Sequence, residues 1–200
     1  VVGAGPTPVR AAAVARLGED GVVVQDPPLG TGHAVLAARD ALADFEGDVL
    51  VTNADCPLLE AKDLEPLFDM RAEGVRLALL GFEPVDPLLY GRLIRGADGH
   101  VLRIVEPVDC TDDERKVKAC YSGMLAAARA DLFGWLSRVT NDNAKGEYFL
   151  TSIVGLAVAD EALVRAHIAS EEAVMGADTP MQLAAAEAQS DAGFFAFPHF

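Results

Sequence analysis

Short apolar runs alternate along the chain with longer segments in which apolar residues recur at helical spacing. The short runs predict buried strands at 22–24, 49–52, 75–82, 118–128 and 163–168. The longer segments predict helices at 8–17, 33–42, 131–139, 149–158 and 179–189, and another around Leu64, Leu67 and Phe68 before Gly74. The alternation favours an α/β fold.

Two local signals add detail. Thr7-Pro8 has the residue types of a helix cap and first helical position, and Gly18 is a natural stop. Asp98-Gly99 between the apolar runs 90–95 and 101–105 predicts a hairpin. We therefore expect one domain over residues 1–200, with a mostly parallel mixed sheet, helices on both faces and a small β insertion.

Composition and charge narrow the function. With 31 acidic and 16 basic residues the net charge is −15, so the chain lacks the basic face that a nucleic-acid binder needs. An acidic surface often serves only solubility, yet a bound Mg²⁺ lets an acidic pocket hold a small anion. Cys56, Cys110 and Cys120 show no metal-ligand spacing, which suggests small buried side chains in a reducing compartment. No apolar run has the length of a membrane span, so we expect a soluble cytoplasmic protein.

Both ends of the chain are unusual. Val1-Val2-Gly3 has the pattern of a strand end that runs into a turn, which suggests a fragment of a longer protein. The tail 194–200 contains four phenylalanines, which are unlikely to stay solvated and suggest no function.

Two strand ends carry polar chemistry. Gln25 precedes a loop in which Gly30 and Gly32 flank Thr31, and such a loop lets backbone N–H groups approach a ligand closely. Asp55 follows a buried strand, at the edge of an α/β sheet where Mg²⁺ and phosphates commonly bind. An ordinary glycine turn and a turn or cap aspartate explain the same residues without a ligand.

Taken together, these stretches resemble the N-terminal uridylyltransferase domain of bifunctional GlmU, the N-acetylglucosamine-1-phosphate uridylyltransferase and glucosamine-1-phosphate acetyltransferase. The resemblance runs from Val1 to about Gln189. It is carried by Gln25, Leu29-Gly30-Thr31-Gly32-His33-Ala34-Val35, Asp55-Cys56-Pro57-Leu58, Tyr90-Gly91-Arg92, Ile104-Val105-Glu106 and the block from Asn141 to Thr151. It implies a Rossmann-like nucleotidyltransferase fold.

The resemblance also implies a role for each matching residue. Gln25 would contact uracil, Gly30 and Thr31 the rest of the nucleotide, and Asp55 both nucleotide and Mg²⁺. The sugar would be held by Gly91 and Glu106, and the block around Lys145 would wall the sugar-phosphate side. Asp178 would be the second Mg²⁺ ligand, in place of the family's Asn.

The chain departs from the family pattern at several points. Tyr121 replaces an Asn that contacts N-acetylglucosamine, and its greater bulk leaves the identity of the acceptor sugar open. Asn53-Ala54 replaces the family's Tyr-Gly before the metal-binding Asp. The Gly-rich phosphate loop and the β-helix acetyltransferase half have no counterpart in the chain. We therefore expect the 200 residues alone to be poorly active.

The implied reaction joins UTP and N-acetylglucosamine 1-phosphate into UDP-N-acetylglucosamine, a cell-wall precursor, with release of pyrophosphate. It needs no catalytic residue beyond metal and phosphate positioning, because the sugar phosphate is already an anion. The whole parent protein is compatible with a homo-oligomer. Two alternatives stay open, a transferase for another acceptor sugar and an inactive nucleotide-binding fragment. We expect none of the four histidines, His33 among them, to be catalytic.

Overall fold

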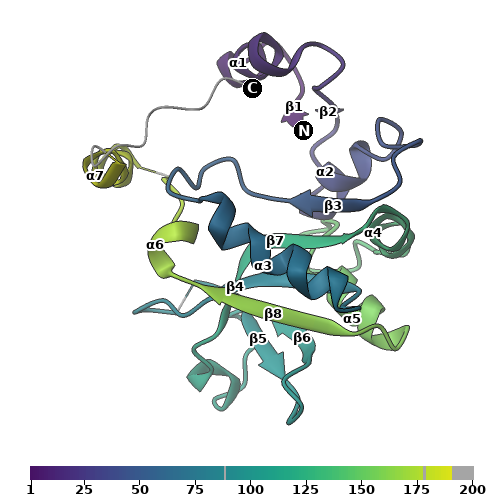
Figure 1. The fold of residues 1–200 in the computed structure, drawn as a ribbon, viewed down its shortest axis with the longest axis vertical. Helices are drawn as coiled ribbons and strands as arrows, with labels where there is room; N and C mark the ends of the chain where they lie inside the picture. The colour runs from purple at the N-terminus through teal and green to yellow at the C-terminus, as the bar shows by residue number, and fades with distance from the viewer. Residues whose placement is uncertain (88, 178, 191–200) are drawn as a thin grey trace.

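The computed structural model describes residues 1–87, 89–177 and 179–190 (Figure 1). Its strands are β1 (Val2–Gly3), β2 (Val24–Gln25), β3 (Asp48–Val51), β4 (Leu77–Phe82), β5 (Arg92–Arg95), β6 (Val101–Val105), β7 (Cys120–Ala128) and β8 (Val164–Ala169). Its α-helices are α1 (Pro8–Leu17), α2 (Thr31–Ala37), α3 (Ala61–Ala72), α4 (Arg129–Leu136), α5 (Ser152–Ala159), α6 (Glu171–Val174) and α7 (Pro180–Ser190). A single 3₁₀ turn spans Glu114–Lys116.

The main sheet is mostly antiparallel, so the expectation of a mostly parallel sheet was wrong. Its order is β6-β5-β7-β4-β8, with β3 also paired to β7. Only β4 and β8 pair in parallel, whereas β7 runs against β3, β4 and β5. Parallel pairs need a crossover between strands. Here β7 follows the β5–β6 hairpin along the chain and pairs antiparallel with both β3 and β4.

The predicted β insertion is confirmed as the hairpin β5–β6, which is antiparallel. Its turn closes through the Gly99 N–H, which donates to Gly96 O at 3.0 Å. Gly99 has a φ of +81°, a conformation that glycine adopts without strain. The Asp-Gly pair in the sequence was therefore a reliable signal.

Helices cover both faces of the main sheet, as expected from the sequence. Alternate residues of β4 supply the two cores: Leu77 and Leu79 face one side, Ala78 and Leu80 the other. Buried side chains of α4 and α5 fill the first core, and α3 and α6 fill the second. Figure 1 shows α3 lying across the near face of the sheet. The strand ends thus stand on a rigid two-sided core.

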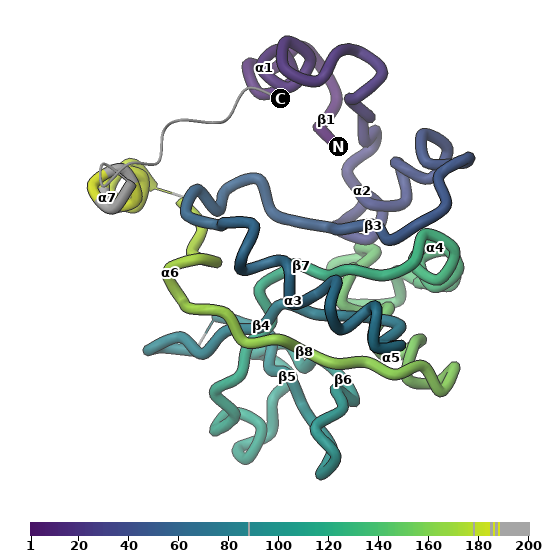
Figure 2. Tube along the Cα trace, in the orientation of Figure 1, coloured from purple at the N-terminus to yellow at the C-terminus, as the bar shows by residue number. Residues whose placement is uncertain are grey.

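The N-terminal part is a small layer apart from the main sheet. β1 and β2 form a parallel two-stranded sheet, and α1 follows β1 (Figure 2). The predicted cap is present: Thr7 Oγ1 accepts from Arg10 N at 3.1 Å, and the helix ends before Gly18. No residue of α1 is buried, so this helix adds little to the core.

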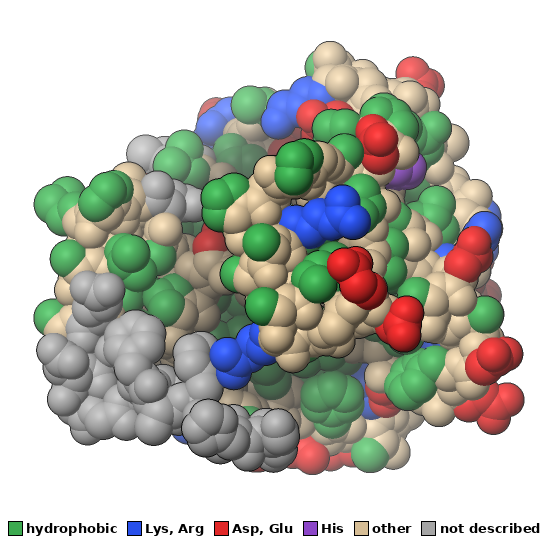
Figure 3. Space-filling view, turned by 90° about the horizontal axis from the view of Figure 1, so that it is seen from above, with side chains coloured by type: hydrophobic (Ala, Val, Ile, Leu, Met, Phe, Trp, Pro, Cys, Tyr) green, Lys and Arg blue, Asp and Glu red, His purple; other side chains and the backbone are tan. Residues whose placement is uncertain are grey.

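Hydrophobic side chains are exposed at the opposite end of the described chain. Met181 is 82% exposed, and Met175 and Leu183 are about half exposed. Figure 3 shows hydrophobic side chains at the left of the molecule, the side on which α7 lies in Figure 1. Among the helices of residues 1–87, 89–177 and 179–190, none is both long enough and apolar enough to span a lipid bilayer. The phenylalanine-rich tail lies outside the described residues.

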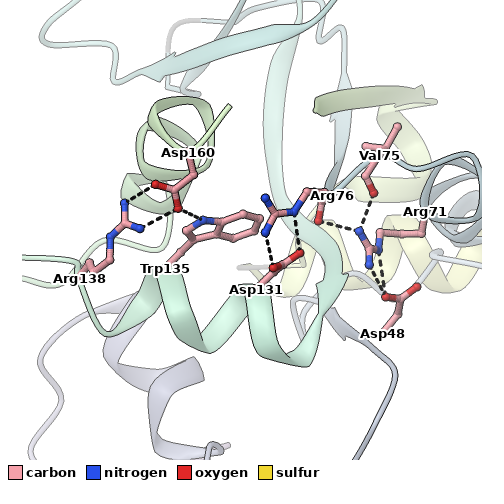
Figure 4. Close-up of polar contacts among 8 residues, drawn as sticks. All are labelled: Asp48, Arg71, Val75, Arg76, Asp131, Trp135, Arg138 and Asp160. Atoms are coloured by element: carbon pink, nitrogen blue, oxygen red, sulfur yellow. Dashed lines mark hydrogen bonds and ion pairs between the residues drawn. The ribbon is translucent and has the colours of Figure 1, made fainter. Parts of the chain in front are cut away.

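Two of the ion-pair clusters drawn in Figure 4 join α4 to α5 and α3 to the strands. In one, Asp160 accepts from Arg138 at 2.7 Å and from Trp135 Nε1 at 3.0 Å, and these bonds lower the pKa of Asp160. In the other, Arg71 of α3 donates to Asp48 at 2.8 Å and to the carbonyl of Val75 at 2.6 Å. Arg71 therefore joins α3, the start of β3 and the approach to β4.

Replacing Arg71 with Met should destabilise the fold by about 1–3 kcal/mol, because it leaves partly buried acceptors without donors. The Arg71 side chain is only 13% exposed. Arg39→Met is the matched control, since the Arg39–Asp40 pair is largely exposed and such pairs contribute little. Urea denaturation of the three proteins measures the effect. Equal stabilities would contradict the structural role of Arg71.

Candidate active site

The loop from Gln25 to His33 is held by its own glutamine. Gln25 Nε2 lies 3.0 Å from the carbonyl oxygen of Gly30 and 3.0 Å from His33 Nδ1. Both contacts join the end of β2 to the start of α2. The side chain that the resemblance assigns to uracil thus also closes the loop around the glycines.

This loop packs against the segment 148–150, more than a hundred residues later in the sequence. The Gly32 N–H donates to Tyr148 O at 2.7 Å, and the Tyr148 N–H donates to Leu29 O at 2.8 Å. Thr31 Oγ1 accepts from the Leu150 N–H at 3.0 Å. The structure therefore brings together the two blocks that carry the family resemblance. The hydroxyl of Thr31 serves this contact, and its role towards a nucleotide stays a prediction.

Gly30 is required at this junction. A Cβ at this position would lie 2.7 Å from Tyr148 O, and its φ is +114°. A side chain would clash with main-chain atoms of Tyr148, and its backbone conformation would be strained.

The loop 141–147 is ordered by one asparagine. Asn143 Oδ1 accepts from the N–H groups of Lys145, at 3.1 Å, and Glu147, at 3.3 Å. Its Nδ2 donates to Glu147 O at 2.6 Å. The Lys145 ammonium lies 6.0 Å from the centre of the Phe149 ring. The loop thus holds a cation near the ring of Phe149, the residue after Tyr148.

Asp55 lies in the turn after β3 and is exposed. Its main-chain oxygen accepts from the Ala177 N–H at 2.8 Å, and the thiol of Cys56 donates to Val174 O at 3.3 Å. These contacts bring the segment that leads to Asp178 beside Asp55. Asp178 itself lies outside the described residues, so its role as a metal ligand stays a prediction.

The described residues contain no group of three or more His, Cys, Asp or Glu side chains that could hold a metal. Asp55 forms no ion pair with another described residue. Of the three cysteines expected to be buried, Cys110 and Cys120 are buried, whereas Cys56 is partly exposed; burial raises the pKa of Cys120.

The two proposed sugar residues are brought together by the hairpin. Gly91 precedes β5 and Glu106 follows β6, and the adjacent Arg92 and Val105 are paired. A Cβ on Gly91 would lie 3.8 Å from Glu106 Oε1. The nearest atom to that Cβ would be Ile104 Cγ2, at 2.9 Å, so a side chain at this position would displace Ile104 next to the carboxylate.

Strand β7 joins this pair to the turn that carries Asp55. The Tyr121 N–H donates to Gly91 O at 2.9 Å, and Asn53 Nδ2 donates to Ser122 O at 2.9 Å. Gly123, with a φ of +91°, leaves room for the Asn53 amide. In the sequence, Asn53 stands out only as a departure from the family pattern, and nothing in its spacing indicates this contact.

Tyr121 is 8% exposed, and its ring belongs to the core on the side of α4 and α5. Burial raises the pKa of its phenol, and the hydroxyl has no hydrogen-bond partner among the described residues. An unpaired buried hydroxyl is costly. The residue at which the chain departs most from the family is therefore also an unsatisfied one.

No protein-family model matches the chain. It is 56% identical over 189 residues to the bifunctional protein GlmU of Caulobacter vibrioides, covering 94% of this chain and 41% of that protein. It is 47% identical over 167 residues to the bifunctional protein GlmU of Hyphomonas neptunium, covering 84% and 36%. The chain thus spans about two fifths of the length of these curated relatives.

Solved structures show the same fold at low identity. A nucleoside-diphosphate-sugar pyrophosphorylase from Vibrio cholerae RC9 aligns with a TM-score of 0.60 and 14% identity, over 78% of this chain and 64% of that chain. An apo UDP-glucose pyrophosphorylase aligns with a TM-score of 0.63 and 18% identity, over 85% and 63%. At these identities the likeness supports the fold alone, an α/β fold with a mixed sheet.

Proposed function

We infer that this chain, a homologue of the N-terminal part of bifunctional GlmU, transfers the uridylyl group of UTP to N-acetylglucosamine 1-phosphate and releases pyrophosphate. The resemblance expected from the sequence is confirmed by the relatives, and it supports nucleotidyl transfer to a sugar phosphate as the reaction class. From the same resemblance we also propose that the acceptor sugar is N-acetylglucosamine 1-phosphate and that the protein works in the cytoplasm.

The observation that carries the proposal is the joined loop pair. The Gly32 N–H donates to Tyr148 O at 2.7 Å and the Tyr148 N–H donates to Leu29 O at 2.8 Å, although the sequence separates these residues widely. This contact places the loop after Gln25 beside the segment that holds Lys145. A nucleotide loop and a sugar-phosphate wall need that proximity for one substrate to reach the other.

The proposed reaction requires the two substrates to be positioned and does not require a general base. The sugar phosphate is already an anion, and it attacks the α-phosphorus in line with the departing pyrophosphate. In this proposal Gln25 and Gly30 hold the nucleoside, Gly91 and Glu106 hold the sugar, and Lys145 offsets phosphate charge. The main-chain N–H of Gly30 suits the nucleotide, since it donates to no other described residue.

Asp55 suits a divalent cation. Its carboxylate is exposed and, among the described residues, has only the Cys56 sulfur as a polar neighbour, at 3.7 Å, whereas the closer acceptor of that thiol is Val174 O. The Ala177–Asp55 contact brings the chain to Asp55 one residue before Asp178. We propose that these two carboxylates hold Mg²⁺, which would neutralise charge on the reacting phosphates. The protein's own part is to keep Asp55 at the end of β3.

A related transferase with another acceptor is the second candidate. Tyr121 favours it, because a buried tyrosine replaces the family's Asn. Pyrophosphate release measured with UTP and either N-acetylglucosamine 1-phosphate or glucose 1-phosphate separates the two. The assay uses the natural protein that carries this chain. Faster release with the first sugar supports the proposal, and faster release with the second favours the alternative.

Gln25→Ala should weaken UTP binding and reduce the preference for UTP over CTP, because the amide oxygen that can accept from the base is lost. Loss of one such contact in a site built for it costs about tenfold in affinity. Calorimetry with both nucleotides measures the change, and Gln182→Ala, in α7, is the control. Identical preferences in wild type and variant would mean that Gln25 only closes its loop.

A further inference from the structure

The orientation of the Gln25 amide follows from its partners. Gly30 O is a carbonyl and can only accept, so the amide nitrogen of Gln25, 3.0 Å away, must donate to it. A primary amide nitrogen has two N–H groups. The second points to His33 Nδ1, also at 3.0 Å. Both amide hydrogens are therefore used inside the loop.

The same contact fixes the state of His33. Because the Gln25 nitrogen has only hydrogens to offer, His33 Nδ1 must be the unprotonated acceptor, and the ring proton must lie on Nε2. The ring is held from one side by Tyr148, with centroids 6.3 Å apart. His33 is thus a fixed acceptor.

Gln25 Oε1 is left without a hydrogen bond to any described residue. Gln25 therefore presents only an acceptor to a ligand at the loop. An acceptor there pairs with the imide N–H of uracil. Cytosine in the same position would set its N3 lone pair against Oε1, and two facing acceptors repel.

We propose that His33 is a positioning residue that locks the Gln25 amide with its oxygen facing the base, and so makes the site select uracil over cytosine. This inference rests on the proposed function, because it assumes that a pyrimidine nucleotide binds at this loop. His33 itself does not touch the substrate. It acts together with Gly30 O: in the flipped orientation, with the amino group facing the base, Oε1 would face two acceptors where it now faces none.

The test compares two variants of His33 in the natural protein that carries this chain. His33→Phe keeps a flat ring and removes the acceptor. It should lower the ratio of the CTP dissociation constant to the UTP dissociation constant by about threefold to tenfold, the effect of one hydrogen bond. His33→Asn is the rescue, since its Oδ1 can stand close to the place of Nδ1, and it should keep the wild-type ratio. A merely structural role predicts parallel losses for both nucleotides.

NMR of the wild-type protein with ¹⁵N-labelled histidine gives a second measurement that needs no variant. We expect His33 protonated on Nε2 and not on Nδ1 in neutral solution. A proton on Nδ1 would overturn the proposal. So would an unchanged CTP to UTP ratio in a folded His33→Phe. If the wild type binds neither nucleotide, the proposed function fails instead.

Discussion

Asp55→Asn is expected to lower the rate of pyrophosphate release by about a hundredfold or more, since several kcal/mol of charge stabilisation depend on a ligand of this kind. The substitution keeps the volume of the side chain and removes its charge. Asp55 is exposed in the turn after β3, and its main chain accepts from Ala177. Its carboxylate has no role in the core, so the fold should persist.

The measurement is pyrophosphate release as a function of Mg²⁺ concentration, with the melting temperature recorded alongside. The variant should need more Mg²⁺ to reach its lower maximum rate, and removing Mg²⁺ with a chelator should abolish the wild-type rate. Asp44→Asn, an exposed aspartate before β3, is the control and should behave as wild type. An active Asp55→Asn with wild-type Mg²⁺ dependence would refute the metal assignment.

Local signals predicted local structure well. Thr7, Pro8 and Gly18 marked the bounds of α1, and Asp98-Gly99 marked the hairpin, because caps and tight turns depend on a few adjacent residues. The helix expected at 33–42 was placed less accurately. It starts at Thr31 and ends at Ala37, where the chain continues as turns. Its start is fixed by Tyr148, which no local pattern reveals.

Strand direction is the clearest failure. The apolar run of β7 reads alike in a parallel and an antiparallel sheet, since both faces are buried in either case. Pairing with β3, β4 and β5 is decided by the path of the chain through the hairpin. Pairing between strands that lie far apart in the sequence depends on the whole fold, so a few adjacent residues cannot predict it.

In the candidate site, too, the sequence predicted where single residues lie and did not predict which other residues they contact. Gln25 and Asp55 could be placed at strand ends from the sequence, because polar residues directly after buried runs are visible there. The sequence could not show that Asn53 binds the main chain of Ser122, or that His33 binds Gln25. His33 was expected to be structural, and only the contact across the loop suggests a role in selectivity.

Gly30→Ala should cost about a hundredfold in turnover, because small misplacements of a substrate-holding loop can have effects of that size. The backbone of Gly30, with φ +114° and ψ 175°, lies in a region that almost only glycine occupies. A Cβ there would also lie 2.7 Å from Tyr148 O and 2.9 Å from Tyr148 N. The loop can relieve this only by moving away from the segment 148–150.

Gly18→Ala separates the two causes of that effect. Gly18 has a similar backbone, with φ 76° and ψ 168°, but no atom lies within 4 Å of its virtual Cβ. Both variants carry a conformational cost of about 1–3 kcal/mol, which urea denaturation measures. Only Gly30→Ala also breaks the contact with Tyr148, so only it should lose UTP binding and turnover. If both variants lose turnover equally, backbone strain alone explains the effect and the joined loop pair is not what holds the nucleotide.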